Sequence, residues 1–175
     1  MELQEWIDGK LTKKEDGYYI EGEKECVLYH YEYESIKKGV ELLCKEYKFE
    51  SVLELGFGKG WTATEFQKQG IKRHVIIEPN KGIYEAALEW NKNYNAEILN
   101  IFSWEYKPEE KFDLVYDDIL AFGNTRDRHY EFIDKFKNQW YANCVQRRSK
   151  NSITKKFDFD FEINNIKYKQ KIYKL

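Results

Sequence analysis

The sequence predicts an α/β domain built on a doubly wound, mostly parallel sheet with an antiparallel hairpin at its C-terminal end. Two observations predict this fold. From residue 51 to residue 141, short apolar runs alternate with segments of helical periodicity, which is typical of parallel βαβ units with right-handed crossovers. From residue 155 onward, residues alternate with period two on both sides of Asn164-Asn165, which indicates a hairpin.

Before residue 51 the pattern is different. Residues 1–33 carry turn signals at several glycines and are expected to form strands and turns. A helix is expected to begin at Glu34-Ser35, with Ser35 as its N-cap, because the apolar residues that follow lie on one face of a 3.6-residue period.

The alternating region contains the remaining predicted elements. The predicted strands cover residues 51–55, 73–78, 96–101 and 111–118, and the predicted helices cover residues 61–69, 81–93 and 127–141. We find no repeat and no linker, so residues 1–175 are expected to form one domain.

Composition excludes several classes of protein. The net charge of −2 argues against a domain that coats nucleic acid. The charge is uneven, because residues 147–175 hold nine Lys or Arg and three acids. A lysine-rich sheet edge explains this excess, and an anionic partner is the alternative. Aromatic residues make up 17% of the chain, which suits either a core or an aromatic-lined pocket.

Cysteines and histidines indicate neither a disulfide framework nor a metal site. The three cysteines are far apart without a CxxC pair, and the three histidines lack metal-ligand spacing. No apolar run approaches the length of a membrane span, and the N-terminus does not resemble a signal peptide. A cytoplasmic location is therefore expected, with no membrane partner.

The strongest chemical signal is the segment Glu54–Gly60, which follows the first strand of the alternating region. Glycine at positions 56, 58 and 60 allows positive φ and close approach of a ligand to the backbone. The segment is not the dinucleotide fingerprint, because Trp61 stands where GxGxxG requires glycine. Glu54 could hold an ammonium group, and Glu78, which ends the next strand, could accept ribose hydroxyls. The alternative is a tight turn flanked by two exposed glutamates.

Residues 52–118 resemble class I methyltransferases, whose first motif is an acid followed by GxGxG. Within that class the sequence is most similar to guanidinoacetate N-methyltransferase and related arginine methyltransferases. VLELGFG at 52–58 looks like the family's VLEVGFG, and residues 74–90 match its strand and helix. The matching positions are Ile76, Ile77, Glu78, Asn80, Gly82, Leu88 and Trp90. Ser103-Trp104-Glu105 stands where the family has Leu-Trp-Glu, and residues 112–118 stand where it has a strand ending in Tyr-Asp.

The resemblance implies a Rossmann-like methyltransferase sheet that binds S-adenosyl-L-methionine. Residues 51–118 would form the cofactor-binding half, after a substrate-side extension over 1–50 and before a C-terminal half over 119–175. The implied cofactor-binding residues are Glu54, Gly56, Phe57, Gly58, Gly60, Glu78, Pro79, Ser103 and Trp104. Of these, Glu54 and the glycines would face the methionine moiety, Glu78 the ribose, and Ser103-Trp104 the adenine. A place in the core is the alternative for Trp104.

The resemblance also implies substrate-binding acids. The family's strand-end Asp matches Asp118 or Asp117, and we prefer Asp118 as the residue that binds the acceptor cation and takes its proton. The family's upstream Trp-Glu-Thr resembles Tyr33-Glu34-Ser35, so Glu34 is the second candidate. Glu32 is its rival, because residues two apart share one face of a strand. Tyr29, Tyr31 and Tyr33 alternate, so only one side of that segment could line a pocket for a cation.

The chain departs from the family after the cofactor-binding half. Residues 119–123 replace a proline-containing segment, and the Lys-Pro-Gly-Gly turn before the fifth strand is missing, with residues 146–149 near that point. We expect N-methylation of a small guanidino or amino compound. The alternatives are methylation of a protein side chain or nucleic acid, and a non-catalytic cofactor-binding module. Ile119-Leu120 after Asp118 is not the Pro-Pro-Tyr of amino-methylating enzymes that act on DNA or RNA bases, which argues against nucleic acid.

Overall fold

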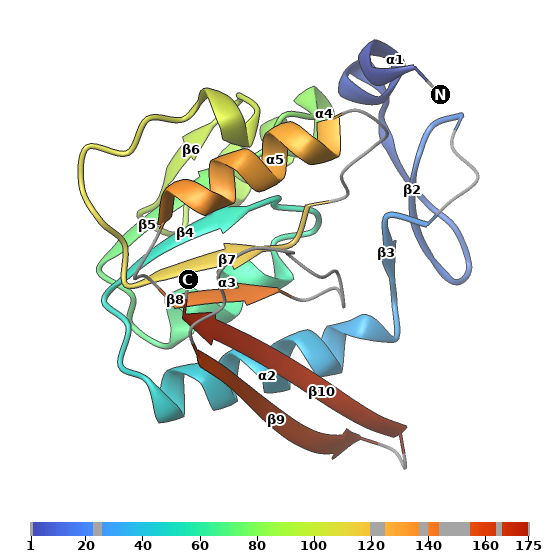
Figure 1. The fold of residues 1–175 in the computed structure, drawn as a ribbon. Helices are drawn as coiled ribbons and strands as arrows, with labels where there is room; N and C mark the ends of the chain where they lie inside the picture. The colour runs from blue at the N-terminus through green and yellow to red at the C-terminus, as the bar shows by residue number, and fades with distance from the viewer. Residues whose placement is uncertain are drawn as a thin grey trace.

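The computed structural model describes residues 2–22, 26–119, 125–136, 140–143, 155–163 and 166–174. Its main sheet has the strand order β6-β5-β4-β7-β8-β10-β9 (Figure 1). The strands are β4 (Ser51–Leu55), β5 (Arg73–Ile77), β6 (Glu97–Leu99), β7 (Leu114–Asp117), β8 (Trp140–Asn143), β9 (Lys155–Ile163) and β10 (Ile166–Lys174). The strands from β6 to β8 are parallel, and β10 runs antiparallel to both β8 and β9. The predicted sheet with its C-terminal hairpin is confirmed.

Helices cover both faces of this sheet. On one face, Leu53, Leu55 and Val115 pack against α5 (Thr125–Ile133) and the 3₁₀ helix η2 (Asp134–Phe136). The opposite face packs against α2 (Glu32–Glu46), α3 (Trp61–Lys68) and α4 (Lys81–Asn91). After β4 the chain proceeds outward to β5 and β6 and then returns to β7 on the other side of β4. The junction of β4 and β7 is therefore a topological switch point, where open α/β sheets bind ligands at the carboxyl ends of their strands.

The N-terminal segment lies at that end of the sheet (Figure 1). It consists of α1 (Leu3–Asp8) and a small antiparallel sheet of β1 (Leu11–Lys13), β2 (Gly17–Ile20) and β3 (Leu28–Tyr29). The short helix α1 was not expected. It packs onto the core through Trp6, which lies in a buried cluster with Phe57 and Ile83. Packing against a distant part of the chain thus stabilises a helix too short to be stable alone.

Two expected helix boundaries are wrong. Helix α2 begins at Glu32 after the N-cap Tyr31, and Ser35 lies inside it with its hydroxyl donating to the Glu32 carbonyl. At the C-terminal side, α5 ends at Ile133, and Trp140 belongs to β8, which pairs in parallel with β7. The spacing of Ile133, Phe136 and Trp140 suits a helix. Hydrogen bonding to β7, however, gives residues 140–143 an extended conformation. The fifth parallel strand therefore precedes residues 146–149, which lie outside the described residues.

Within the described ranges, no helix is long and apolar enough to cross a membrane. The same ranges hold no group of three or more potential metal ligands.

Candidate active site

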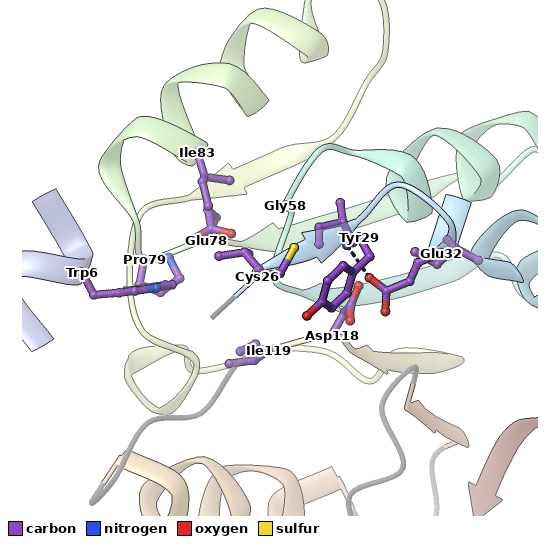
Figure 2. Close-up of a pocket in the computed structure, with 14 residues that line it drawn as sticks. Trp6, Cys26, Tyr29, Glu32, Gly58, Glu78, Pro79, Ile83, Asp118 and Ile119 are labelled. Carbon is purple, nitrogen blue, oxygen red and sulfur yellow. Dashed lines mark hydrogen bonds between the residues drawn. The ribbon is translucent and has the colours of Figure 1, made fainter. Parts of the chain in front are cut away.

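A cavity of about 200 Å³ lies at the carboxyl ends of β4, β5 and β7 (Figure 2). The loops after these three strands contribute Gly56, Gly58, Glu78, Pro79, Asp118 and Ile119. Trp6 of α1, residues 26–29, Glu32 and Ile36 of α2, and Ile83 of α4 complete the lining. Figure 2 shows Tyr29, Glu32 and Asp118 grouped at one end of the cavity, with Glu78, Pro79 and Trp6 toward the other.

The glycine loop after β4 brings backbone to the cavity wall. Gly56 and Gly60 have φ of 89° and 69°, and a Cβ at either position would meet a close neighbour. At Gly56 that neighbour is the Asp118 carbonyl oxygen at 2.8 Å, and at Gly60 it is the Phe57 ring at 2.5 Å. Gly58 also has positive φ, but a Cβ there would contact only Leu28. The first and third glycines therefore permit close packing, while Gly58 leaves the backbone open toward the cavity.

Glu78 is the buried acid of the site. Its carboxylate accepts hydrogen bonds from the backbone N–H groups of Phe57 and Asn80, each at 2.9 Å. Burial raises the pKa of Glu78 to about 7, although these N–H groups and that of Gly58 favour the charged form. The Asn100 side chain donates to the carbonyl groups of Glu78 and Pro79 and so holds the end of β5 in place. A carboxylate has more acceptor positions than these bonds occupy, so Glu78 could also accept ligand hydroxyls.

Glu54, in contrast, does not line the cavity. Its side chain is fully buried beneath the glycine loop, with Oε2 at 2.8 Å from Nε2 of His74. Nδ1 of His74 in turn lies 3.0 Å from the Gln67 amide nitrogen on α3. Burial raises the pKa of Glu54, and the bond to His74 opposes that effect. The acid that the motif assigns to the methionine moiety is thus bound to a histidine of the neighbouring strand.

Ser103 and Trp104 also lie outside the cavity lining. They belong to the 3₁₀ helix η1 (Ser103–Glu105). Ser103 is buried, and its Oγ lies 3.1 Å from Nδ1 of His129 on α5. Trp104 is half-buried, stacks on Phe102 with ring centroids 4.5 Å apart, and packs against the core. Trp104 thus lies at the edge of the core, with part of its ring exposed.

The neighbouring acids at the end of β7 face opposite sides. Asp118 lines the cavity, whereas Asp117 is buried on the α5 face, with Oδ2 at 3.0 Å from Nε2 of His129. Successive side chains of an extended chain point to opposite faces, so only one of the two reaches the cavity.

The two candidate acids of residues 32–34 are separated in the same way. Glu32 lines the cavity, and its Oε2 accepts the backbone N–H of Tyr29 at 2.7 Å. Glu34 is exposed and lies outside the lining. The expectation that Glu32 and Glu34 share one face of a strand is wrong, because both lie in the first turn of α2. There, two residues are about 200° apart around the helix axis.

Only one of the three alternating tyrosines lines the cavity. Tyr29 does so, and Tyr31, which is 63% exposed, stacks on it with ring centroids 5.1 Å apart. Tyr33 packs edge-on against Trp61 instead. Sequence reasoning missed several other residues of the cavity wall, namely Trp6, Cys26, Val27, Leu28, Ile36, Ile83 and Ile119. They are buried or partly buried apolar residues, and only long-range packing brings them here.

A model of the family described as guanidinoacetate N-methyltransferase matches residues 26–145, which is more than half of the chain. The chain belongs to the guanidinoacetate N-methyltransferase family. It is therefore a methyltransferase of the S-adenosylmethionine-dependent class, as the resemblance in its sequence implied.

Solved structures support the same fold for this family member. The N-methyltransferase NodS from Bradyrhizobium japonicum WM9 matches with a TM-score of 0.59 at 12% identity, covering 82% of this chain and 95% of NodS. PH1948 from Pyrococcus horikoshii carries a provisional assignment as an RNA methyltransferase. It matches with a TM-score of 0.57 at 12% identity, covering 80% of this chain and 82% of PH1948. NodS is also known in complex with S-adenosyl-L-homocysteine. At these identities the likeness shows a Rossmann-like methyltransferase fold.

Proposed function

We propose that this chain binds S-adenosyl-L-methionine and transfers its methyl group to a nitrogen of a small guanidino or amino compound. One observation carries the proposal. The cavity combines the glycine loop and the buried Glu78 with a second group of acids, Glu32 and Asp118, beside the Tyr29 ring. The first group suits the cofactor, and the second suits a cationic acceptor.

Three of the described residues fit the cofactor. The open backbone at Gly58 allows the methionine moiety to approach closely, and Glu78 would accept hydrogen bonds from the ribose hydroxyls. Pro79 lines the cavity beside Glu78 and would contact the adenine side. When bound, the cofactor supplies an electrophilic methyl group on a sulfonium.

The acceptor end would bind a cation and orient its nitrogen. Glu32 is held in place by the Tyr29 N–H, and burial raises the pKa of its carboxyl group. A cation beside Glu32 and Asp118 would favour the charged forms of both, and the Tyr29 ring would add a cation–π contact. Asp118 would then take a proton from the nitrogen and leave a lone pair aligned with the methyl group.

Turnover measurements on three variants test this assignment. The assay follows S-adenosyl-L-homocysteine formation with guanidinoacetate, methylguanidine and ethanolamine as small acceptors, and with RNA and an arginine-rich peptide as large ones. We expect turnover with a small acceptor, a loss of about 100-fold or more in Asp118→Asn and Glu32→Gln, and unchanged cofactor affinity in both variants. Glu34→Gln, with its exposed side chain on the same helix turn, is the matched comparison and should keep wild-type turnover.

The opposite outcomes are equally clear. Turnover with RNA or the peptide alone would replace the small acceptor by a macromolecule. Loss of turnover in Glu34→Gln, together with full activity in Glu32→Gln, would move the second acid to position 34. Wild-type turnover in Asp118→Asn would overturn the proposed acceptor site.

A further inference from the structure

A second polar network lies next to the cavity but outside its lining. Ser103 of η1, His129 of α5 and Asp117 of β7 form a continuous chain in which Oγ lies 3.1 Å from Nδ1, and Nε2 lies 3.0 Å from Oδ2. The exposed fractions of the three residues are 2%, 3% and 4%. Buried polar groups of this kind are costly unless they are paired, so the three side chains are held in one arrangement.

This network combines the residue types of a hydrolytic triad, but its three side chains are too deeply buried to act as one. No substrate could reach the Ser103 hydroxyl, because Ser103 is almost fully buried. What the network does must therefore follow from the elements that it joins.

At one end, the network reaches the turn that carries Asp118. The second oxygen of Asp117, Oδ1, accepts the backbone N–H of Ile119 at 3.3 Å. The N–H of Asp118 itself donates to the Leu55 carbonyl at 2.9 Å. Asp118 and Ile119 both line the cavity. The Asp117 carboxylate thus holds the backbone after Asp118, while the Leu55 carbonyl holds the N–H of Asp118 itself.

At the other end, the network reaches the loop that supports the cofactor side. Ser103 follows Asn100 by three residues, and the Asn100 side chain holds the carbonyl groups of Glu78 and Pro79. The Ser103–His129–Asp117 chain thereby joins the loop after β6 to the loop after β7, with α5 between them.

We propose that His129 and Ser103 are positioning residues, which hold Asp117 on the α5 face so that its carboxylate orders the 117–119 turn and directs Asp118 at the acceptor. The proposal deepens the proposed function, on which it rests for the role of Asp118. It assigns no direct contact with substrate to His129 or Ser103.

The first test is a set of substitutions at His129, read out in two ways. His129→Leu removes the hydrogen bond between His129 and Asp117, whereas His129→Gln keeps an N–H donor near the position of Nε2. Calorimetric titration with methylguanidine in the presence of S-adenosyl-L-homocysteine should show binding at least tenfold weaker in the Leu variant and close to wild type in the Gln variant. Hydrogen exchange at the Ile119 amide should accelerate at least tenfold in the Leu variant and recover in the Gln variant.

Ser103→Ala tests the end of the network that lies farthest from Asp117. Loss of one hydrogen bond to His129 should weaken methylguanidine binding about fivefold, and S-adenosyl-L-homocysteine affinity should stay within about twofold of wild type. Equal weakening of both ligands would mean that Ser103 only supports the cofactor loop and would overturn its part of the proposal.

A double variant separates positioning from stability. Asp117→Leu with His129→Leu replaces the whole pair by apolar side chains, which restores the stability lost in a variant that removes one partner. The turn would still lack the carboxylate that accepts the Ile119 N–H, so methylguanidine binding should stay weak in a stably folded protein. If affinity returns together with stability, the network is merely structural and the proposal is wrong.

The two readouts also distinguish this proposal from the function on which it rests. If methylguanidine and the other small cations do not bind the wild-type protein, the proposed acceptor site fails, while Ile119 exchange still reports whether His129 orders the turn. If they bind and Ile119 exchange is the same in wild type and His129→Leu, the acceptor site stands and the positioning role is excluded.

Discussion

At the residue scale, the carboxyl group of Glu78 combines deep burial with backbone N–H donors. Its pKa in the folded protein is about 7, against an ordinary value of 4.5 for a glutamate in water. Between these two values the folded state holds a proton that the unfolded state has released. The contribution of Glu78 to stability is therefore fully present below about pH 4.5 and is lost as the pH rises through about 7.

A pH series checks this prediction. The free energy of unfolding of the wild type, relative to Glu78→Gln, should fall by about 3 kcal/mol between pH 4.5 and pH 7.5, because one pKa unit corresponds to about 1.4 kcal/mol. Urea denaturation at several pH values measures it, and the Gln variant removes the contributions of all other groups by difference. Parallel profiles for the two proteins would show that Glu78 titrates normally.

At the scale of elements, the glycines on either side of α3 illustrate two different reasons for glycine. Gly70, after the helix, has φ of 81°, and a Cβ added there would have no atom within 4 Å, so only backbone conformation disfavours a side chain. Gly56, before the helix, has a similar φ of 89° but also lies against the Asp118 carbonyl.

These two positions make a matched pair. Gly70→Ala should lower the free energy of unfolding by about 1–2 kcal/mol, the cost of a left-handed conformation for alanine. Gly56→Ala should cost about 1–3 kcal/mol more, because the new methyl group must displace backbone that leads into Asp118. Chemical denaturation of both variants gives the difference, and equal losses would mean that the loop relaxes without strain.

Asn80 connects two elements that are distant in sequence. Its Oδ1 caps α4 by accepting the Ile83 N–H at 2.9 Å, while Nδ2 donates to the carbonyl groups of Trp6 and Gly9. One side chain thus begins α4 and also holds α1 over the cavity.

Two substitutions separate these roles. Asn80→Ser keeps a capping oxygen but is too short to reach the N-terminal segment, so it should speed hydrogen exchange in α1 with little change in α4. Asn80→Ala should speed hydrogen exchange in both α1 and α4. It should also lower the free energy of unfolding by about 1 kcal/mol more than Asn80→Ser does. Unchanged exchange in α1 in both variants would show that the Asn80 side chain does not hold the helix.

At the scale of the whole molecule, ligand binding and folding are linked. S-adenosyl-L-homocysteine at 100 times its dissociation constant should stabilise the protein by about 2.7 kcal/mol, which for a chain of this size corresponds to a rise in Tm of about 5–10 °C. Glu78→Ala should weaken the ligand by about 1–3 kcal/mol and reduce the rise at the same ligand concentration. Glu85→Ala, an exposed acid on the adjacent helix, is the control and should behave as the wild type. No rise in the wild type would contradict cofactor binding.

Much of the fold was accessible from the sequence because it is encoded locally. Strand and helix periodicities define β4 to β7 and α3 to α4, and the handedness of crossovers then restricts how they assemble. The glycine loop and Glu78 were found for the same reason, since each stands directly after a predicted strand. Carboxyl ends of parallel strands meet at one edge of a sheet, so their convergence in one cavity follows from the pattern.

What the sequence by itself determined is therefore the α/β fold, its family and the position of the glycine loop with Glu78. Tertiary structure alone decided which acids reach the cavity. Asp118 and Glu32 line it, while Asp117 pairs with His129 and Glu34 is exposed. The physical reason is that a shift of one or two residues at an element boundary turns a side chain to another face. Those boundaries depend on packing and hydrogen bonds between residues far apart in the chain.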